Sequence, residues 1–423
     1  MQNHYNTRLV IPKNTILAFI LLSFIFIYPE SLGGIYIYIP MFIVGLVALN
    51  AMIKIPMNIQ ARYFFVFALY MMGMSLFFSF INGNDLFVTI RSTIRLFYPF
   101  LAIVVGGFFR KKISDKTLLY ILLTVLLIEF VVSLLQFNNT GFREWSYSLY
   151  RSENTVDKYL ENFNYSTGRR AIGTLNNPNT LGLAFIVLNS SIIILSDLLK
   201  EKRIKRTIGI IATLATIYVI VNTQSRTSIL IYVFVIGLIF YWKFSKRSRN
   251  NVIFLVISSI AAAFLLLFIQ SKTSREINIS ALDSRFNIWD IRISQMLDYV
   301  EYESFFAYIL GGGFQMARSF GFFDNTYLKV FVSGGIIGLF MFFMVISKMF
   351  KGIRKISRVE YRHLAWVLFF TWIIGSMVVE YQEIFKLSTI TFILIGYTLY
   401  SDLRNNNSAV CTLKNNNFVG DKT

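Results

Sequence analysis

Four arginines lie in a polar stretch between two apolar runs of the chain, and this stretch is the first place where chemistry is expected. It runs from Gln270 to Asp324, holds Arg275, Arg285, Arg292 and Arg318, and ends in Asp324-Asn325. Guanidinium groups bind anionic oxygens through paired N–H donors and stay charged when partly desolvated. The topology derived below puts the stretch on the outer face of a membrane, where arginines have no topological role. We therefore expect an anionic substrate.

Two further polar motifs stand at the ends of apolar runs. The first is Arg169-Arg170-Ala-Ile-Gly173-Thr-Leu-Asn176-Asn177-Pro178-Asn179, and the second is Asn222-Thr-Gln-Ser-Arg226-Thr-Ser228. Asparagine and proline also begin helices, and an arginine can reach the interface without binding a ligand. Polar groups at membrane depth are costly unless they line a polar cavity. This cost favours function for the first motif and leaves both interpretations open for the second.

The elements that must position these motifs are membrane helices. The 423 residues are 55% hydrophobic and 17% aromatic, with a mean hydropathy of +0.58. The runs are apolar on all sides, which favours helices over the alternating strands of outer-membrane barrels. At about 20 residues per crossing we expect about twelve spans in an all-α bundle. They cover residues 14–29, 33–52, 62–81, 94–109, 117–137, 173–196, 207–222, 227–242, 251–269, 325–347, 363–380 and 384–401.

The net charge of +19 is distributed as a topology signal. With the N-terminus inside, every second loop is basic, as the positive-inside rule expects, so we expect no nucleic-acid partner. The termini are then cytoplasmic, and the first apolar run is a retained span rather than a cleaved signal. Cys411 is the only cysteine, which excludes an intrachain disulfide and a cysteine-cluster metal site. His4 and His363 both fall outside the outer face, so no histidine can act there as a base.

The chain is expected to form one transmembrane domain over residues 1–401, followed by a cytoplasmic tail at 402–423. Two long outer loops, 138–171 and 270–324, are the functional candidates, because most connections are only a few residues long. The second loop has apolar residues at helical spacing from Leu282 to Val300, which predicts an amphipathic helix containing Trp289. A lid without chemistry is an equally good interpretation of that helix.

Acidic residues are few within the apolar runs. Glu129 lies inside the fifth expected span, whereas Glu380 and Glu383 come at the end of the eleventh. A carboxylate inside a membrane is a functional candidate, although Glu129 could equally pair with an arginine for structural reasons. So few charges within the spans argue against an ion-coupled transporter. Taken alone, Asp324 is best explained as a helix cap.

In their order along the chain, these motifs resemble the superfamily of O-antigen ligases and O-antigen polymerases (Wzy). The resemblance spans roughly residues 169 to 345. It is carried by Arg170 with Gly173-Thr174 and Asn177-Pro178-Asn179, Ser225-Arg226, Ser284-Arg285 with Trp289, Gly311-Gly312-Gly313, and Asp324-Asn325-Thr-Tyr-Leu with Gly334-Gly335-Ile-Ile-Gly338. About twelve spans with a large outer loop before the tenth also suit this family.

The resemblance implies a glycosyltransferase of the bacterial inner membrane, active at the periplasmic face without metal or other cofactor. Its donor is a glycan on undecaprenyl diphosphate. We expect Arg170, Arg226 and Arg285 to bind the diphosphate and Asp324 to accept the proton of the attacking hydroxyl. Ligases usually carry histidine where Asp324 stands, so the sequence favours a polymerase. The further substrate-binding candidates are Arg169, Asn177, Asn179, Arg318, Asn325, Trp289 and Glu380.

Two other functions stay open at this point. One is the ligase of the same superfamily, which transfers the polysaccharide to lipid A-core. The other is a flippase for lipid-linked oligosaccharides, which predicts functional charges within the spans and two related halves. The candidate residues gather at the outer face and no halves repeat, which disfavours a flippase. The product is O-antigen or capsule, and a chain-length regulator is an expected partner of a polymerase.

Overall fold

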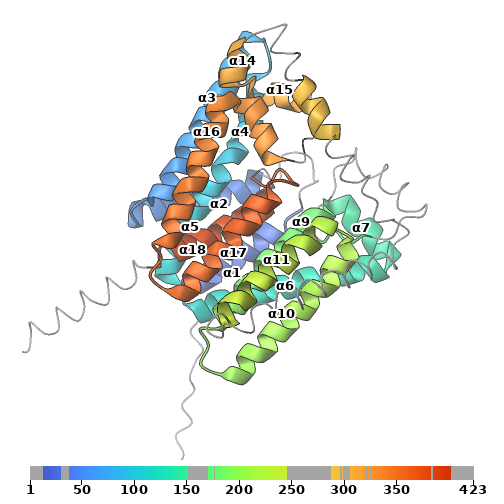
Figure 1. The fold of residues 1–423 in the computed structure, drawn as a ribbon. Helices are drawn as coiled ribbons and strands as arrows, with labels where there is room; N and C mark the ends of the chain where they lie inside the picture. Colours follow the sequence, from blue (N-terminus) through green and yellow to red (C-terminus); the bar gives the residue numbers. More distant parts are fainter. Residues whose placement is uncertain are drawn as a thin grey trace, which may run out of the picture.

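The protein folds as a bundle of helices, and every regular element of its described residues is helical (Figure 1). The computed structural model describes residues 13–29, 38–150, 170–175, 177–244, 287–295, 298, 305–319, 323, 325–382 and 384–401. Its elements are α1 (Lys13–Ile27), α2 (Tyr38–Lys54), α3 (Ile59–Ile81), α4 (Leu86–Thr93), η1 (Ile94–Phe97), α5 (Tyr98–Lys112), α6 (Asp115–Asn138), α7 (Thr140–Tyr150), α9 (Pro178–Ser196), α10 (Lys202–Thr223), α11 (Arg226–Phe244), α14 (Phe305–Leu310), α15 (Gly313–Ser319), α16 (Thr326–Arg354), α17 (Val359–Gly375) and α18 (Phe385–Leu399).

Seven helical segments of the described residues are long and apolar enough to cross a bilayer. They are Ile59–Ile81, Leu86–Lys112, Asp115–Asn138, Pro178–Ser196, Lys202–Thr223, Arg226–Lys243 and Thr326–Arg354, and shorter apolar helices cover Thr15–Ile27, Ile39–Lys54 and Phe385–Leu399. These helices indicate a membrane-embedded helical protein. The expected span over 251–269 lies outside the described residues, so the total of about twelve spans stays a prediction.

Two expected boundaries are wrong, and local chemistry explains both. The span expected over 173–196 begins only at Pro178, because Asn177 caps α9 by accepting the Asn179 N–H at 2.8 Å and a proline sits in the first turn. Gly173 has a φ of +56° in the turn before it. The span expected over 363–380 ends at Gly375, and residues 376–384 connect α17 to α18. Glu380 therefore lies in this connection, beyond the end of the helix.

Large apolar side chains remain exposed on the outer helices, whereas α18 is buried along its length from Phe385 to Thr398. Ile53 on α2 is 86% exposed and Phe80 on α3 is 77% exposed. Water would penalise surfaces of this kind, whereas lipid chains would cover them. Figure 1 shows α17 and α18 between the group of α3, α5 and α16 and the group of α9, α10 and α11.

The helices at the centre approach closely through glycines. A Cβ at Gly106 of α5 would collide with the Ile393 carbonyl of α18, and one at Gly396 of α18 would collide with the Ile103 carbonyl of α5. Small residues let membrane helices bring their backbones together in this way. The contact fixes α18 against α5, so the first turn of α18 is held in a defined place.

The two glycine motifs of the sequence pack against each other. Gly311, between α14 and α15, has a φ of +83°, and Gly335 breaks the helical geometry inside α16 with a φ of +62°. A Cβ at either position would collide with the backbone of the other segment, and Gly312 N donates to Val332 O at 3.0 Å. The α14–α15 segment therefore rests on the kink of α16. Gly334 also packs closely against Met71 of α3, which the absence of a side chain at this position permits.

Charged side chains meet at one end of the bundle, here called the basic end. There Arg110 of α5 pairs with Asp115 of α6 at 2.7 Å, and Asp197 after α9 pairs with Lys205 of α10 and Lys243 of α11. The opposite ends of α6 and α9 are joined where Gln136 of α6 bonds Gly173 O at 2.9 Å, just before α9. The two ion-pair groups therefore share one end. The other end is called the distal end.

Candidate functional site

The loop over residues 170–175 lies at the distal end and is held in shape by one buried side chain. Gln136 of α6 donates from Nε2 to Gly173 O at 2.9 Å, and its Oε1 accepts the N–H groups of Gly173 at 2.9 Å and Ile172 at 3.2 Å. The side chain thus satisfies three backbone groups of the loop. We call residues 170–175 the Arg170 loop.

A buried carboxylate and a buried ammonium group meet beneath this loop. Glu129 accepts the Thr174 N–H at 3.2 Å and also the Thr174 hydroxyl, and it is 0% exposed. Lys386 of α18 donates to Phe26 O at 2.9 Å and to Thr174 O, and it is 1% exposed. The two opposite charges act on each other across Thr174. Among the described residues, the positive charge that acts on Glu129 is therefore that of Lys386.

Gly173 and Tyr150 complete the surroundings of this pair. A Cβ at Gly173 would lie 2.7 Å from Glu129 Oε2, so the position needs glycine for space as well as for its positive φ. Tyr150, the last residue of α7, places its ring 5.0 Å from Lys386 Nζ and donates its hydroxyl to Ile27 O at 2.7 Å. Burial raises the pKa of Tyr150 to about 12, with a smaller contribution from the Glu129 charge.

Arg170 docks its loop onto the end of α10. Its Nε donates to Thr223 O at 2.7 Å, and the N–H of Ala171 donates to Asn222 O at 3.0 Å. On its other side the Arg170 carbonyl accepts the Tyr147 hydroxyl of α7 at 2.6 Å. As a residue, Arg170 is half-buried. The contact with Thr223 brings Arg170 to the turn that links α10 and α11.

The same turn presents Arg226, the first residue of α11. Gln224 adopts a left-handed φ of 50°, and Ser225 then caps α11 by accepting the Ser228 N–H at 3.2 Å. The Ser228 hydroxyl in turn reaches Asn179 O of α9 at 3.4 Å. The first turns of α9 and α11 therefore lie together, and each helix start carries partial positive charge. This region has the electrostatic character of an anion site.

A second polar cluster forms where α16 begins. Asn325 caps α16 by accepting the N–H groups of Tyr327 at 2.9 Å and Leu328 at 3.1 Å. Glu380 pairs with Lys329 at 2.6 Å and accepts the Phe323 N–H at 3.3 Å. Lys329 and Glu380 also form part of the wall of a small cavity, which is lined by Leu96, Phe314, Thr326, Lys329, Val330, Glu380 and Gln382. It leaves about 10 Å³ for the centre of a water molecule, which is roughly the space that one water needs.

The structure brings some of the expected site residues together and leaves others unplaced. Arg170, Arg226, Asn177 and Asn179 share the first cluster, although the Asn177 side chain is used to cap α9. Asn325 and Glu380 share the second, and the Asn325 side chain is likewise used as a cap. Trp289 lies on the helical residues 287–295, within the expected amphipathic helix. Arg318 belongs to α15, of which only the backbone is described at this position. Arg169, Arg285, Asp324 and Glu383 lie outside the described residues.

Three polar residues of these clusters were not singled out by the sequence. Lys386 and Lys329 carry charge near the starts of apolar helices, and Gln136 stands near the end of another. A lysine inside an apolar run is a detectable signal of a buried polar site, because a charge at membrane depth is costly. Gln136 gave no such signal, since a glutamine near a helix end is common.

Comparison with known proteins does not extend these observations. The sequence matches no model of a protein family, and a search of curated proteins finds no match. The resemblance to O-antigen polymerases and ligases therefore rests on the order of the motifs quoted above. Within the part of the chain that the structure describes, no three His, Cys, Asp or Glu side chains lie close enough to hold a metal.

Proposed function

We propose that the protein is a repeat-unit polymerase for a surface polysaccharide, either O-antigen or capsule. It is a metal-independent glycosyltransferase that moves a glycan from undecaprenyl diphosphate to a sugar hydroxyl of another lipid-linked unit. The observation that carries the proposal is the meeting of Arg170, from the Arg170 loop, with the turn that presents Arg226, at the distal end. Two arginines beside the starts of α9 and α11 suit a diphosphate.

The reaction needs positive charge where the leaving group departs. The acceptor oxygen attacks the anomeric carbon, the bond from that carbon to the phosphate oxygen breaks, and undecaprenyl diphosphate leaves with the electron pair. Arg170 and Arg226, together with Arg285, would stabilise the charge that develops on the diphosphate. The hydroxyl proton passes to a base. We propose Asp324 for this role, because it occupies the position of the motif at which ligases of the superfamily usually carry histidine.

We propose an orientation in the membrane from the distribution of charge. Lysines and arginines concentrate at the basic end, which the positive-inside rule assigns to the cytoplasm. The distal end then faces the periplasm, where lipid-linked repeat units and a chain-length regulator are expected to meet the enzyme. We accordingly propose the bacterial inner membrane as the location, with both termini in the cytoplasm.

The deciding experiment compares surface glycans of a deletion strain and of strains carrying variants. Loss of a polymerase leaves core capped with single repeat units, whereas loss of a ligase leaves bare core. Arg170→Ala and Arg285→Ala should abolish long polymer while the protein stays in the membrane. Arg143→Ala is the matched control, because this arginine lies on α7 at the same end and bonds Thr140 instead. Bare core in the deletion strain would replace the polymerase proposal with the ligase.

One observation favours a flippase as a second candidate, namely the buried charges of Glu129 and Lys386 within the apolar helices. Both groups are engaged with Thr174 and support the Arg170 loop, which is why the enzyme is preferred. A reaction with purified protein and lipid-linked units in detergent separates the two functions. Polymer formed without any membrane to cross supports the enzyme, whereas absence of polymer together with lipid movement in vesicles supports the flippase.

A further inference from the structure

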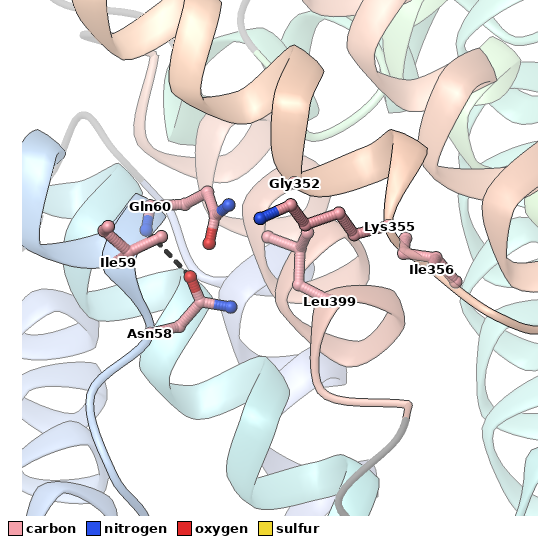
Figure 2. A pocket seen from close by; sticks show the side chains of 7 residues that line it. All are labelled: Asn58, Ile59, Gln60, Gly352, Lys355, Ile356 and Leu399. Atoms are coloured by element: carbon pink, nitrogen blue, oxygen red, sulfur yellow. Dashed lines mark hydrogen bonds between the residues drawn. The ribbon is translucent and has the colours of Figure 1, made fainter.

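A pocket at the basic end stands apart from the proposed active site. The pocket has a volume of about 330 Å³ and is lined by Asn58, Ile59, Gln60, Gly352, Lys355, Ile356 and Leu399. The start of α3 forms one wall, and the last turns of α16 and α18 form the others. Figure 2 shows Lys355 extending across the pocket toward Gln60. The pocket thus has a cationic group on one side and amide groups on the other.

The polar groups of the pocket are held in fixed places. Asn58 Oδ1 accepts the Gln60 N–H at 2.7 Å, so the amide nitrogen of Asn58 is turned toward the pocket (Figure 2). Asn58 N donates to the Tyr400 hydroxyl at 2.7 Å, and Gln60 Nε2 donates to Lys348 O at 3.2 Å. These bonds tie α3 to the ends of α18 and α16. The pocket wall is therefore built before any ligand arrives.

The charges around the pocket favour an anion. None of its seven lining residues is acidic, and Lys355 supplies an ammonium group. The pocket also lies at the start of α3, whose first N–H groups carry partial positive charge, and the Lys355 ammonium offsets the partial negative charge at the C-terminal end of α16. Lys351 and Arg354 add exposed positive charge on the same turn of α16. A compact group with several acceptor oxygens, such as a phosphate, matches these donors.

The position of the pocket indicates which kind of molecule carries the phosphate group. The pocket lies where apolar helices end, and Ile59 in its wall is 54% exposed beside it. A phospholipid placed here would bring its headgroup to the donors and its chains against the apolar surface of α3. Basic pockets between membrane helices bind anionic headgroups on the cytoplasmic side. A freely diffusing phosphate would use the donors but not the apolar wall.

We propose that this pocket binds the phosphate group of an anionic phospholipid in the leaflet at the basic end. Lys355 contacts a phosphate oxygen, the Asn58 amide donates to another, and the acyl chains lie along α3. Headgroup binding there braces α3, α16 and α18 against one another at the membrane surface. The proposal is independent of the reaction carried out at the distal end.

The test measures lipid retention by the full-length protein, purified in detergent, using native mass spectrometry. The probes are phosphatidylglycerol, phosphatidylcholine with the same chains, and inorganic phosphate. Lys355→Met should weaken phosphatidylglycerol binding by about fivefold, the effect of one lysine near a membrane surface, and Lys355→Arg should restore it. Lys351→Met is the matched control, since Lys351 is exposed on the same turn but does not line the pocket.

The outcomes separate the possible sources of phosphate. Preference for phosphatidylglycerol over phosphatidylcholine that is lost only in Lys355→Met supports the proposal. Competition by inorganic phosphate at millimolar concentration supports the phosphate chemistry of the site. Binding of inorganic phosphate without any preference among lipids overturns the lipid source. Equal losses in Lys355→Met and Lys351→Met also overturn the proposal, because they would show diffuse surface charge rather than a pocket.

Discussion

Replacing Lys386 by methionine should destabilise the protein, because it removes the buried positive charge beside Glu129 and the donor of two buried carbonyl groups. Methionine keeps much of the length and apolar stem of lysine but removes the ammonium group. Phe26 O and Thr174 O then lose a charged donor inside the protein. The carboxylate beneath the Arg170 loop keeps only its contacts with Thr174. The change therefore acts on both the stability and the shape of this loop.

The expected magnitude follows from the burial of the pair. Glu129 is 0% exposed and Lys386 is 1% exposed, and leaving a buried acceptor without its donor costs about 1–3 kcal/mol, or more where a charged group is involved. Neutralising both partners should cost less than the sum of the single changes, because Glu129→Gln removes the stranded charge in the double variant. We expect a coupling free energy of about 1–3 kcal/mol between the two positions.

The assay is denaturant unfolding of the purified protein in detergent, with hydrogen exchange of the amides in residues 171–175 as a local measurement. Lys111→Met is the control, since Lys111 is exposed at the basic end and bonds Lys54 O at 3.4 Å. A surface change of this kind should alter the free energy of unfolding by about 0.5 kcal/mol at most. Equal stability of Lys386→Met and Lys111→Met would refute the reasoning, as would strictly additive effects in the double variant.

Three further predictions concern the same end of the bundle. Gly173→Ala should lower the free energy of unfolding by at least about 1 kcal/mol, because alanine is strained at positive φ and its Cβ would meet Glu129 Oε2 at 2.7 Å. Chemical denaturation measures this loss, and wild-type stability of the variant would contradict the geometry. Arg226→Ala should weaken binding of a lipid diphosphate by about tenfold to hundredfold, as expected for the loss of a charged hydrogen bond. Titration of the protein with labelled lipid measures this affinity, and an unchanged affinity would show that the arginine only faces the membrane interface. Tyr150 has a pKa of about 12 in the folded protein against 10.0 ordinarily. Its contribution is therefore complete below pH 10 and is lost as the pH rises toward 12, so Tyr150→Phe should reduce the alkaline loss of stability, and identical pH profiles would argue against the shift.

The membrane class and the helical architecture could be predicted from the sequence. Runs of apolar residues such as those in α6 and α16 report their own length and environment, because crossing a bilayer requires about 20 apolar residues wherever they occur. The alternation of basic loops likewise predicted which charges share an end, and the ion pairs of Asp115 and Asp197 lie together there. The length of an apolar run and the charge of a loop are local properties of the chain, so they can be predicted directly from the sequence.

The candidate site could be predicted only in part. Arg170 and Arg226 were expected to act together, and the hydrogen bond from Arg170 to Thr223 O places both at one turn. The start of α9 was placed too early, since the Gly173 turn depends on Gln136, a residue 37 positions earlier in the chain. Asn177 and Asn325 proved to be helix caps, a role that the sequence had allowed for asparagine beside a helix start.

By itself, the sequence determined that the chain forms helices apolar enough to cross a membrane, with positive charge gathered at one end, because hydropathy and charge are properties of local segments. Only the tertiary structure decided what lies beneath the Arg170 loop. Glu129 and Lys386 are 257 positions apart in the numbering, and each alone would be too costly to bury. They become compatible with the interior when α18 packs beside α5 and its first turn meets Thr174. One buried charge compensates another only when the two groups are close in space, and the fold, rather than the order of residues along the chain, sets that distance.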